Sequence, residues 1–245
     1  MKSSNFNSKY RIIDLSQEIY EGMPVSKDTQ QTFIMTNQTH EQNMVVTGSK
    51  TLGFSARNLL ISEQGPTHTK ASSSFDYKGL SIDKMDFEYF YGNGICLDLS
   101  HKRYPELIEV EDIKKSMDRF RLDLKKGDVI LIYTGHYNRF YPELEYSGIR
   151  AKHTGLSYEC VAYLGANGIV NIGLDTPSLD SNPQNSAISG YEACYKYDIT
   201  CTENLCNLRQ LIGARFVYFG LPLRIRGGTG SPIRAVALIE KKHTF

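Results

Sequence analysis

Apolar and polar residues recur along the chain in patterns that predict a series of β-strands. Short β-rich segments bounded by polar turns predict a first strand and then a meander of three antiparallel strands. Longer, continuously apolar runs such as DVILIYTG predict strands that are covered on both faces of a sheet. The predicted strands cover 10–16, the meander 33–38, 43–49 and 56–62, the apolar runs 93–100, 128–135 and 168–176, and the closing segments 215–223 and 233–241.

Helical periodicity appears between these strands. Residues 109–120 carry apolar side chains three and four positions apart, which predicts an amphipathic helix. Residues 157–168 begin with Ser157, a plausible N-cap, and end in a glycine, which predicts a second helix.

A third helix is predicted for residues 202–211. Thr202 would be its N-cap, and Glu203 would lie in its first turn, where the helix dipole favours a carboxylate. Strands and helices interspersed over one continuous chain predict an α/β fold with a mixed sheet, and a βαβ crossover fits the run from 128 to 176. We expect a single domain over residues 1–245, with a flexible N-terminus at 1–9.

Composition and charge exclude several classes of function. The formal net charge is +1, so no overall field attracts nucleic acid or an anionic membrane. No window reaches the apolar length of a membrane span, and the first residues lack the apolar core of a signal peptide. The five cysteines form no CxxC pair, which argues against a disulfide framework. These features predict a cytoplasmic protein without nucleic-acid or membrane partners.

Candidate chemistry lies in two segments rich in small residues. The first is SEQGPTHTKASSSF, residues 62–75, which contains His68 and Lys70. The second, residues 221–238, carries glycines, prolines and arginines between two apolar strands. It could be a tight hairpin or a loop that lines a site, with Arg226 available to bind a carboxylate.

Four segments together resemble the cyclase family, which includes bacterial kynurenine formamidase and isatin hydrolase. The resemblance runs in order through IIDLSQEIYEGMPV (12–25), SEQGPTHTKASSSF (62–75), TGLSYECVAYLGANGIVNIGLDTPSLD (154–180) and the stretch from TENLCNLRQL to the C-terminal strand (202–238). It implies a single mixed-sheet α/β domain of the swivelling β/β/α type. It also implies assembly as a homodimer or homotetramer and action on a small-molecule substrate.

The second segment departs from the family pattern, His-x-Gly-Thr-His-x-Asp-x-Pro-x-x-x-His with a later His and, twelve residues on, a Glu. In the family these residues bind one or two divalent metals and transfer protons. Only two of the six chemical positions keep their residue in this chain. The aligned residues are Gln64, His68, Lys70 and Ser74 in the loop, with Ser72 in place of the proline, and Tyr191 and Glu203 in the distal part.

This residue set argues against the family's metal mechanism. A divalent metal needs several nitrogen or carboxylate donors that converge, and an ammonium ~4 Å away would repel it by several kcal/mol. We therefore expect no metal and no cofactor, and we interpret Lys70 as a replacement for the metal, paired with Glu203. Two alternatives remain open: a desolvated Lys70 with a lowered pKa that acts as base or nucleophile, or a Lys70 that points to solvent.

Three functions remain open. The first is a metal-independent enzyme that cyclises, isomerises, dehydrates or hydrolyses a small carbonyl compound, in a biosynthetic pathway. Its catalytic residues would be His68 as base, Lys70 at the oxyanion, Tyr191 as donor and Glu203 as orienting group. Its substrate-binding residues would be Gln64, Ser72, Ser74, His136 and Arg226.

The second function is that of a catalytically inactive protein that binds a small molecule or a partner subunit. The third is a metal-dependent amidohydrolase, arylformamidase-like, with shifted ligands. The loss of the family's metal positions favours the second as well as the first, because a metal is the main electrophile in such sites.

Overall fold

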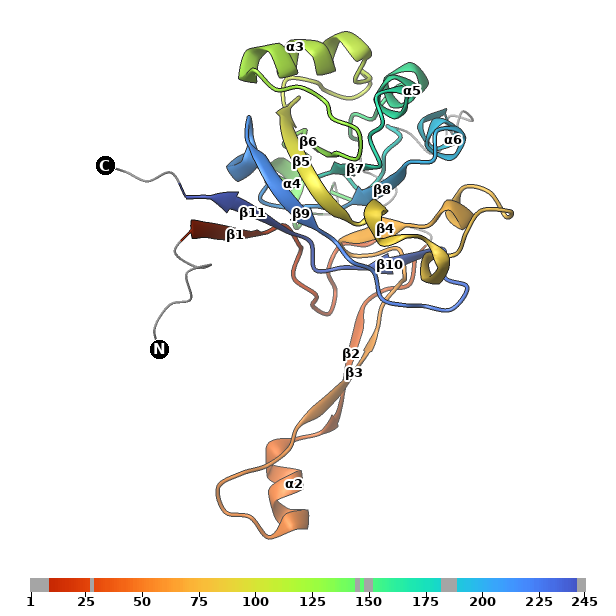
Figure 1. The fold of residues 1–245 in the computed structure, drawn as a ribbon. Helices are drawn as coiled ribbons and strands as arrows, with labels where there is room; N and C mark the ends of the chain where they lie inside the picture. Colours follow the sequence, from red (N-terminus) through yellow and green to blue (C-terminus); the bar gives the residue numbers. More distant parts are fainter. Residues whose placement is uncertain (1–8, 27–28, 144–145, 148–151, 182–188, 242–245) are drawn as a thin grey trace.

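The computed structural model describes residues 9–26, 29–143, 146–147, 152–181 and 189–241. The main body of the described structure is built on a curled sheet of nine strands. Their order is β1-β11-β9-β5-β6-β7-β8-β4-β10. A separate two-stranded ribbon, β2 with β3, projects away from the body and carries helix α2 at its end (Figure 1).

The bounds of the elements follow the chain in order. The strands are β1 Tyr10–Asp14, β2 Phe33–Gln38, β3 Ala56–Leu60, β4 His68–Lys70, β5 Tyr91–Asp98, β6 Val129–Tyr133, β7 Asn171–Leu174, β8 Thr200–Glu203, β9 Arg215–Phe219, β10 Gly230–Pro232 and β11 Val236–Glu240. The helices are α2 His40–Thr47, α3 Val110–Phe120, α4 His136–Phe140, α5 Tyr158–Ala166 and α6 Ser189–Lys196. Short 3-10 turns include η5, Leu208–Leu211.

Strands β5 to β8 run parallel at the centre of the sheet, and β9, β11, β1, β4 and β10 join them antiparallel. Helices α3, α5 and α6 cover one face (Figure 1), where apolar side chains of β5 and β6 such as Ile95 and Ile130 pack against theirs. A second core lies on the other face, around Leu131 and Tyr218. Burial on both faces explains why these central strands read as continuous apolar runs.

The predicted fold class is confirmed: the chain forms a mixed-sheet α/β domain with parallel crossovers. The strands predicted at 10–16, 33–38, 56–62, 93–100, 128–135, 168–176, 215–223 and 233–241 are all present, as are the helices at 109–120 and 157–168. Ser157 caps α5 by accepting the Cys160 N–H at 3.1 Å. The domain extent of 1–245 stays a prediction, and most of the predicted flexible segment 1–9 lies outside the described residues.

The strand predicted at 43–49 is wrong, because this segment is part of helix α2. Thr39 and Gln42 form a capping box at its start, and Gly48 adopts a left-handed conformation at its end, with φ 70°. These two local signals outweigh the β propensity of Val45 and Val46. The meander is therefore a two-stranded ribbon with a helical tip.

The helix predicted at 202–211 is also wrong. Residues Thr200–Glu203 form β8, which pairs parallel to β7 and antiparallel to β4. Asn204 and Asn207 have positive φ values of 60° and 59°, and this backbone conformation interrupts a right-handed helix. Glu203 therefore lies at the end of a buried strand and not at a helix N-terminus.

The glycine-rich segment 221–238 is not a tight hairpin between its flanking strands. Its strand β10 pairs with β4, with Gly230 opposite Lys70 and Pro232 opposite His68. The segment therefore supports β4 from the edge of the sheet. Among the described residues, no helix is both long and apolar enough to cross a membrane.

Candidate functional site

Three of the four predicted catalytic residues meet around the buried carboxylate of the fourth, Glu203. Strand β4 pairs antiparallel with β8 so that His68 lies opposite Glu203. Because side chains alternate along a strand, His68 and Lys70 project from the same face of β4. Helix α6 brings Tyr191 to the same point. Three elements that are distant in sequence thus build the cluster.

Protein groups surround both oxygens of Glu203, whose side chain is 1% exposed. Its Oε1 accepts hydrogen bonds from the Tyr191 hydroxyl at 2.6 Å and from the Leu179 N–H at 3.0 Å. Its Oε2 lies 3.2 Å from His68 Nε2 and 3.3 Å from Lys70 Nζ. The Cys201 thiol also approaches Oε1, at 3.8 Å, so five groups of the chain itself contact the carboxylate.

The electrostatics of the cluster keep Glu203 ionised. Burial acts to raise the pKa of this carboxyl, but the Lys70 ammonium, His68 and the Tyr191 hydroxyl outweigh burial and lower the pKa to about 2. For Tyr191, burial and the Glu203 charge raise the pKa of the phenol. At neutral pH the cluster consists of a carboxylate, an ammonium and a neutral phenol that can donate a hydrogen bond.

Lys70 is the cation of this cluster. Its side chain is 12% exposed, and its Nζ donates to the Tyr191 hydroxyl at 3.0 Å and lies 4.3 Å from the centre of that ring. Burial acts to lower the pKa of the ammonium, but the Glu203 charge reverses this effect and raises the pKa above its usual value. The solvent-pointing alternative is therefore wrong. The alternative of a lysine with a lowered pKa is also wrong, because the Glu203 carboxylate lies 3.3 Å from the ammonium and stabilises its charged form.

The two ring nitrogens of His68 face different partners. Its Nδ1 lies 3.0 Å from the Pro66 carbonyl, and because a carbonyl can only accept, Nδ1 carries the proton. Its Nε2 is buried and faces Glu203 Oε2 without the alignment of a hydrogen bond. Nε2 is therefore the nitrogen of this imidazole that faces the Glu203 carboxylate.

The loop after β7 contributes two residues to which sequence reasoning assigned no catalytic role. Ser178 Oγ lies 2.8 Å from the Tyr191 hydroxyl. Asp180 is buried, and burial raises its pKa to about 6, although the Gly190 N–H that donates to it at 3.0 Å opposes this shift. The sequence signal for both was the polar stretch DTPSLD directly after a buried strand, a common position for site residues.

The five predicted substrate-binding residues lie in four places. Gln64 and Ser74 lie together: the Gln64 amide donates to Ser74 Oγ at 3.2 Å and to Thr229 Oγ1 at 2.9 Å. Ser72 Oγ points toward Met85 Sδ at 4.0 Å. Arg226 is exposed in the turn before β10. The contacts of these residues differ from those of the Glu203 cluster, and their binding roles stay predictions.

His136, the fifth predicted substrate contact, is buried at the start of α4. Its Nε2 donates to the Tyr146 carbonyl at 2.8 Å, and its ring packs 5.4 Å from that of His153. Burial lowers the pKa of His136 to about 4, although the hydrogen bond to Tyr146 opposes this shift. The imidazole is therefore neutral at physiological pH.

This lowered pKa predicts an acid-dependent loss of stability. Between pH 6.5 and about 4, the unfolded chain binds a proton that folded His136 does not bind, so the free energy of unfolding falls as the pH falls. The expected loss is about 3 kcal/mol for this one group. Urea unfolding at pH 7 and pH 4.5 should show a smaller difference for His136→Phe than for the wild type.

The control for this measurement is His101→Gln. The His101 side chain is 64% exposed, so this variant should keep the pH dependence of the wild type. An unchanged pH dependence in His136→Phe would contradict the assignment to His136.

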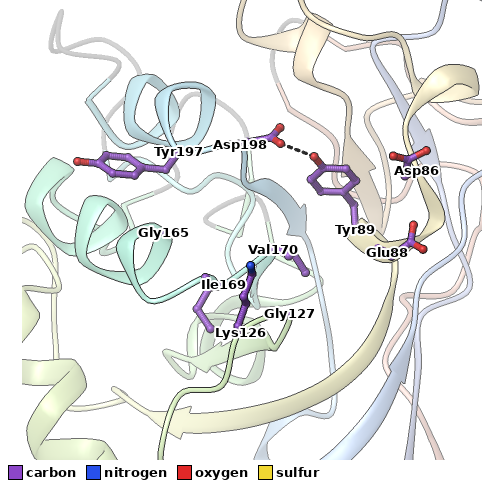
Figure 2. A pocket seen from close by; sticks show the side chains of 11 residues that line it. Asp86, Glu88, Tyr89, Lys126, Gly127, Gly165, Ile169, Val170, Tyr197 and Asp198 are labelled. Carbon is purple, nitrogen blue, oxygen red and sulfur yellow. Dashed lines mark hydrogen bonds between the residues drawn. The ribbon is translucent and has the colours of Figure 1, made fainter.

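A separate cavity of about 610 Å³ lies at the amino ends of β6 and β7. Figure 2 shows that Asp86, Glu88 and Tyr89 line one side of it, and the Tyr89 hydroxyl donates to Asp198. Open α/β sheets bind ligands at the carboxyl ends of their parallel strands, where Glu203 ends β8. This cavity lies at the other end of the sheet and is not part of the Glu203 cluster.

Comparison with known proteins agrees with this fold. Residues 13–181 match the "Cyclase" family model, described as "Putative cyclase". The kynurenine formamidase of Erythrobacter litoralis is 27% identical over 95% of this chain and 96% of its own length. The structure of isatin hydrolase A from Ralstonia solanacearum superposes with a TM-score of 0.82 at 23% identity, covering 94% of this chain and 92% of that one.

A further solved structure shares the fold. A protein described as a potential metal-dependent hydrolase with cyclase activity superposes with a TM-score of 0.71 at 18% identity, covering 95% of this chain and all of that one. The residues of the present chain do not fit such a metal. Within the described ranges, no group of three or more His, Cys, Asp or Glu side chains is placed to hold an ion. His68 and Glu203 are two donors, and the Lys70 ammonium lies beside them.

Proposed function

The chain belongs to the cyclase family, and we propose that it is a hydrolase-like enzyme of this family that works on a small carbonyl compound without a metal. The observation that carries the proposal is the position of Lys70 Nζ, 3.3 Å from Glu203 Oε2 and 3.0 Å from the Tyr191 hydroxyl. A fixed, protonated ammonium at this point can supply the positive charge that a metal would supply to a developing oxyanion. The hydrolase names of the curated relatives support the choice of reaction class.

In the proposed reaction, His68 and Lys70 divide the chemistry. His68 Nε2 takes a proton from water as the water oxygen bonds to the carbonyl carbon, and the carbonyl oxygen becomes an oxyanion beside the Lys70 ammonium. When the oxyanion collapses, the carbon–nitrogen bond breaks, and the leaving nitrogen takes the proton back from His68. Glu203 keeps Lys70 charged and positions it. The Tyr191 hydroxyl forms hydrogen bonds with both Glu203 and Lys70 and so fixes the two side chains.

Substitution of His68 tests this role. With isatin and formanilide as probes, His68→Gln should lower kcat at least about 100-fold, because a general base contributes ~10²–10⁴-fold. Thermal unfolding should show that the variant stays folded, and prior dialysis of the wild type against a chelator should leave its rate unchanged. A His68→Gln protein with the wild-type rate would exclude this role.

One observation favours the alternative of a catalytically inactive protein: groups of the chain itself already contact both oxygens of Glu203. In that case the cluster would be a structural replacement for the metal, and the protein would bind a small molecule or partner without changing it. Wild-type protein that leaves both probes unchanged, together with saturable binding of either probe in calorimetry, would favour this alternative. Turnover that depends on His68 would exclude it.

A further inference from the structure

Asn204 follows Glu203 at the end of β8 and turns the chain away from the strand. Its φ of 60° lies in the left-handed region, which asparagine adopts more readily than most residues. Hydrogen bonds hold both of its backbone polar groups: its N–H donates to the Thr176 carbonyl at 2.9 Å, and its carbonyl accepts from the Thr67 hydroxyl at 2.6 Å. The backbone therefore fixes the direction of the Asn204 side chain, one residue after the buried carboxylate of the cluster.

The Asn204 side chain and the His68 ring share one acceptor. Asn204 Nδ2 donates to the Pro66 carbonyl at 2.8 Å, and His68 Nδ1 donates to the same oxygen at 3.0 Å. A carbonyl oxygen has two lone pairs, so it can accept from both. The orientation of the buried ring depends on this carbonyl at Nδ1 and on Glu203 Oε2, which faces Nε2. The carbonyl that orients His68 is thus itself held by the Asn204 amide.

A buried tyrosine holds the other end of this amide. Tyr146 is 1% exposed, and its hydroxyl donates to Asn204 Oδ1 at 2.9 Å and accepts from Gln17 Nε2 at 2.6 Å. Half a turn of the amide would break the bond from the hydroxyl and would place Asn204 Oδ1 against the Pro66 oxygen, where two acceptors cannot bond. The amide therefore has one orientation, with its N–H toward Pro66.

We propose that Asn204, held by the Tyr146 hydroxyl, is a positioning residue for His68. Asn204 fixes the Pro66 carbonyl, and this carbonyl fixes the direction in which His68 Nε2 points. Nε2 lies 3.2 Å from Glu203 Oε2, and the proposed reaction needs this nitrogen in one place. A displacement of about 1 Å in a reacting group can cost on the order of 100-fold in rate. The inference rests on the proposed role of His68 as base.

The substitution Asn204→Asp removes the donor and little else. A carboxylate has nearly the shape of the amide and still accepts from Tyr146, but it has no N–H for the Pro66 carbonyl. For isatin and formanilide, kcat should fall about 10- to 100-fold with KM nearly unchanged, because the base moves and the substrate contacts stay. Asn207→Asp is the matched control: Asn207 has a φ of 59° and donates to the Asp14 carbonyl at 2.8 Å, so this variant should keep the wild-type kcat.

The substitution Tyr146→Phe tests the order of the network. It removes only the hydroxyl and should lower kcat in the same sense, by less than Asn204→Asp does. Because Tyr146 acts through Asn204, the double variant should be no slower than Asn204→Asp alone. Losses that multiply in the double variant would overturn this order. Thermal unfolding shows whether each variant is folded. Should Asn204→Asp not fold, a wild-type kcat in Tyr146→Phe would overturn the proposal, and a lowered kcat would support it.

An NMR measurement separates this inference from the proposed function, because it needs no turnover. In isotope-labelled wild type, His68 should show an Nδ1 proton that is protected from exchange with water, assigned by its absence from His68→Gln. Asn204→Asp should lose this signal through exchange, and Asn207→Asp should keep it. Wild-type protein that turns over neither probe would contradict the proposed function, and the NMR signal would still decide the positioning role. A protected Nδ1 proton in Asn204→Asp, or a wild-type kcat in it beside a slow His68→Gln, would overturn that role.

Discussion

Replacement of Lys70 by methionine should lower the free energy of unfolding by about 3–5 kcal/mol, because it leaves a buried carboxylate without its cation. Glu203 is 1% exposed, and the ammonium that balances it lies 3.3 Å away. Methionine keeps most of the side-chain volume, so the loss reports mainly on charge. Urea unfolding at pH 7 measures it directly. The same variant should also lose turnover of both probes, since it lacks the group proposed to face the oxyanion.

A double substitution distinguishes a charge effect from a packing effect. Lys70→Met combined with Glu203→Gln removes both charges, so it should recover most of the stability lost in Lys70→Met alone. Lys114→Met is the matched control, because Lys114 and Glu111 form a solvent-exposed ion pair at 2.9 Å whose loss should leave the free energy of unfolding nearly unchanged. A loss of less than about 1 kcal/mol in Lys70→Met would show that the buried pair is not the electrostatic centre of this cluster.

The combination of Lys70→Asp with Tyr191→His should create a site that binds about one equivalent of Zn²⁺, whereas we expect the wild type to retain none. The reason is the convergence of the site: His68 Nε2, Lys70 Nζ and the Tyr191 hydroxyl all lie within 3.3 Å of a Glu203 oxygen. The double variant would present two imidazoles and two carboxylates at this point and would remove the repelling ammonium. Elemental analysis after dialysis measures the bound metal.

Two measurements keep this second prediction decisive. The metal-free double variant could be unstable, so its thermal unfolding is compared with and without Zn²⁺, which should raise its midpoint by mass action. Tyr191→His alone is the control, because it adds a ligand but keeps Lys70, and it should retain no metal. Stoichiometric metal in the wild type, or none in the double variant, would contradict the interpretation that Lys70 stands in for a cation.

The parts of the fold that could be read from the sequence are those with a strong local signal. The central strands β5, β6 and β7 are continuously apolar because both of their faces are buried, and the amphipathic stripe of α3 is complete. The errors lie where a local signal was weak or was misread. At 43–49 the pair Val45 and Val46 indicated a strand, although the capping box and the glycine that follows were also in the sequence.

The error at 202–211 has a different cause. Thr202 and Glu203 are typical of a helix start, and only pairing with β7 and β4, which are distant in sequence, makes them strand residues. Helix α6, which carries Tyr191, was not predicted, because its residues have no clear apolar stripe of their own. Its position against the sheet results from packing with α5 and β8.

The family and the loss of its metal donors followed from the order of residues alone, because both depend on which side chains are present at matched positions. A lysine in place of an aspartate is visible without coordinates. Whether that lysine is a base, a solvent-exposed charge or a paired cation was decided by the tertiary structure. The pKa of an ammonium depends on its burial and on its distance to a carboxylate, and both arise when β4, β8 and α6 come together.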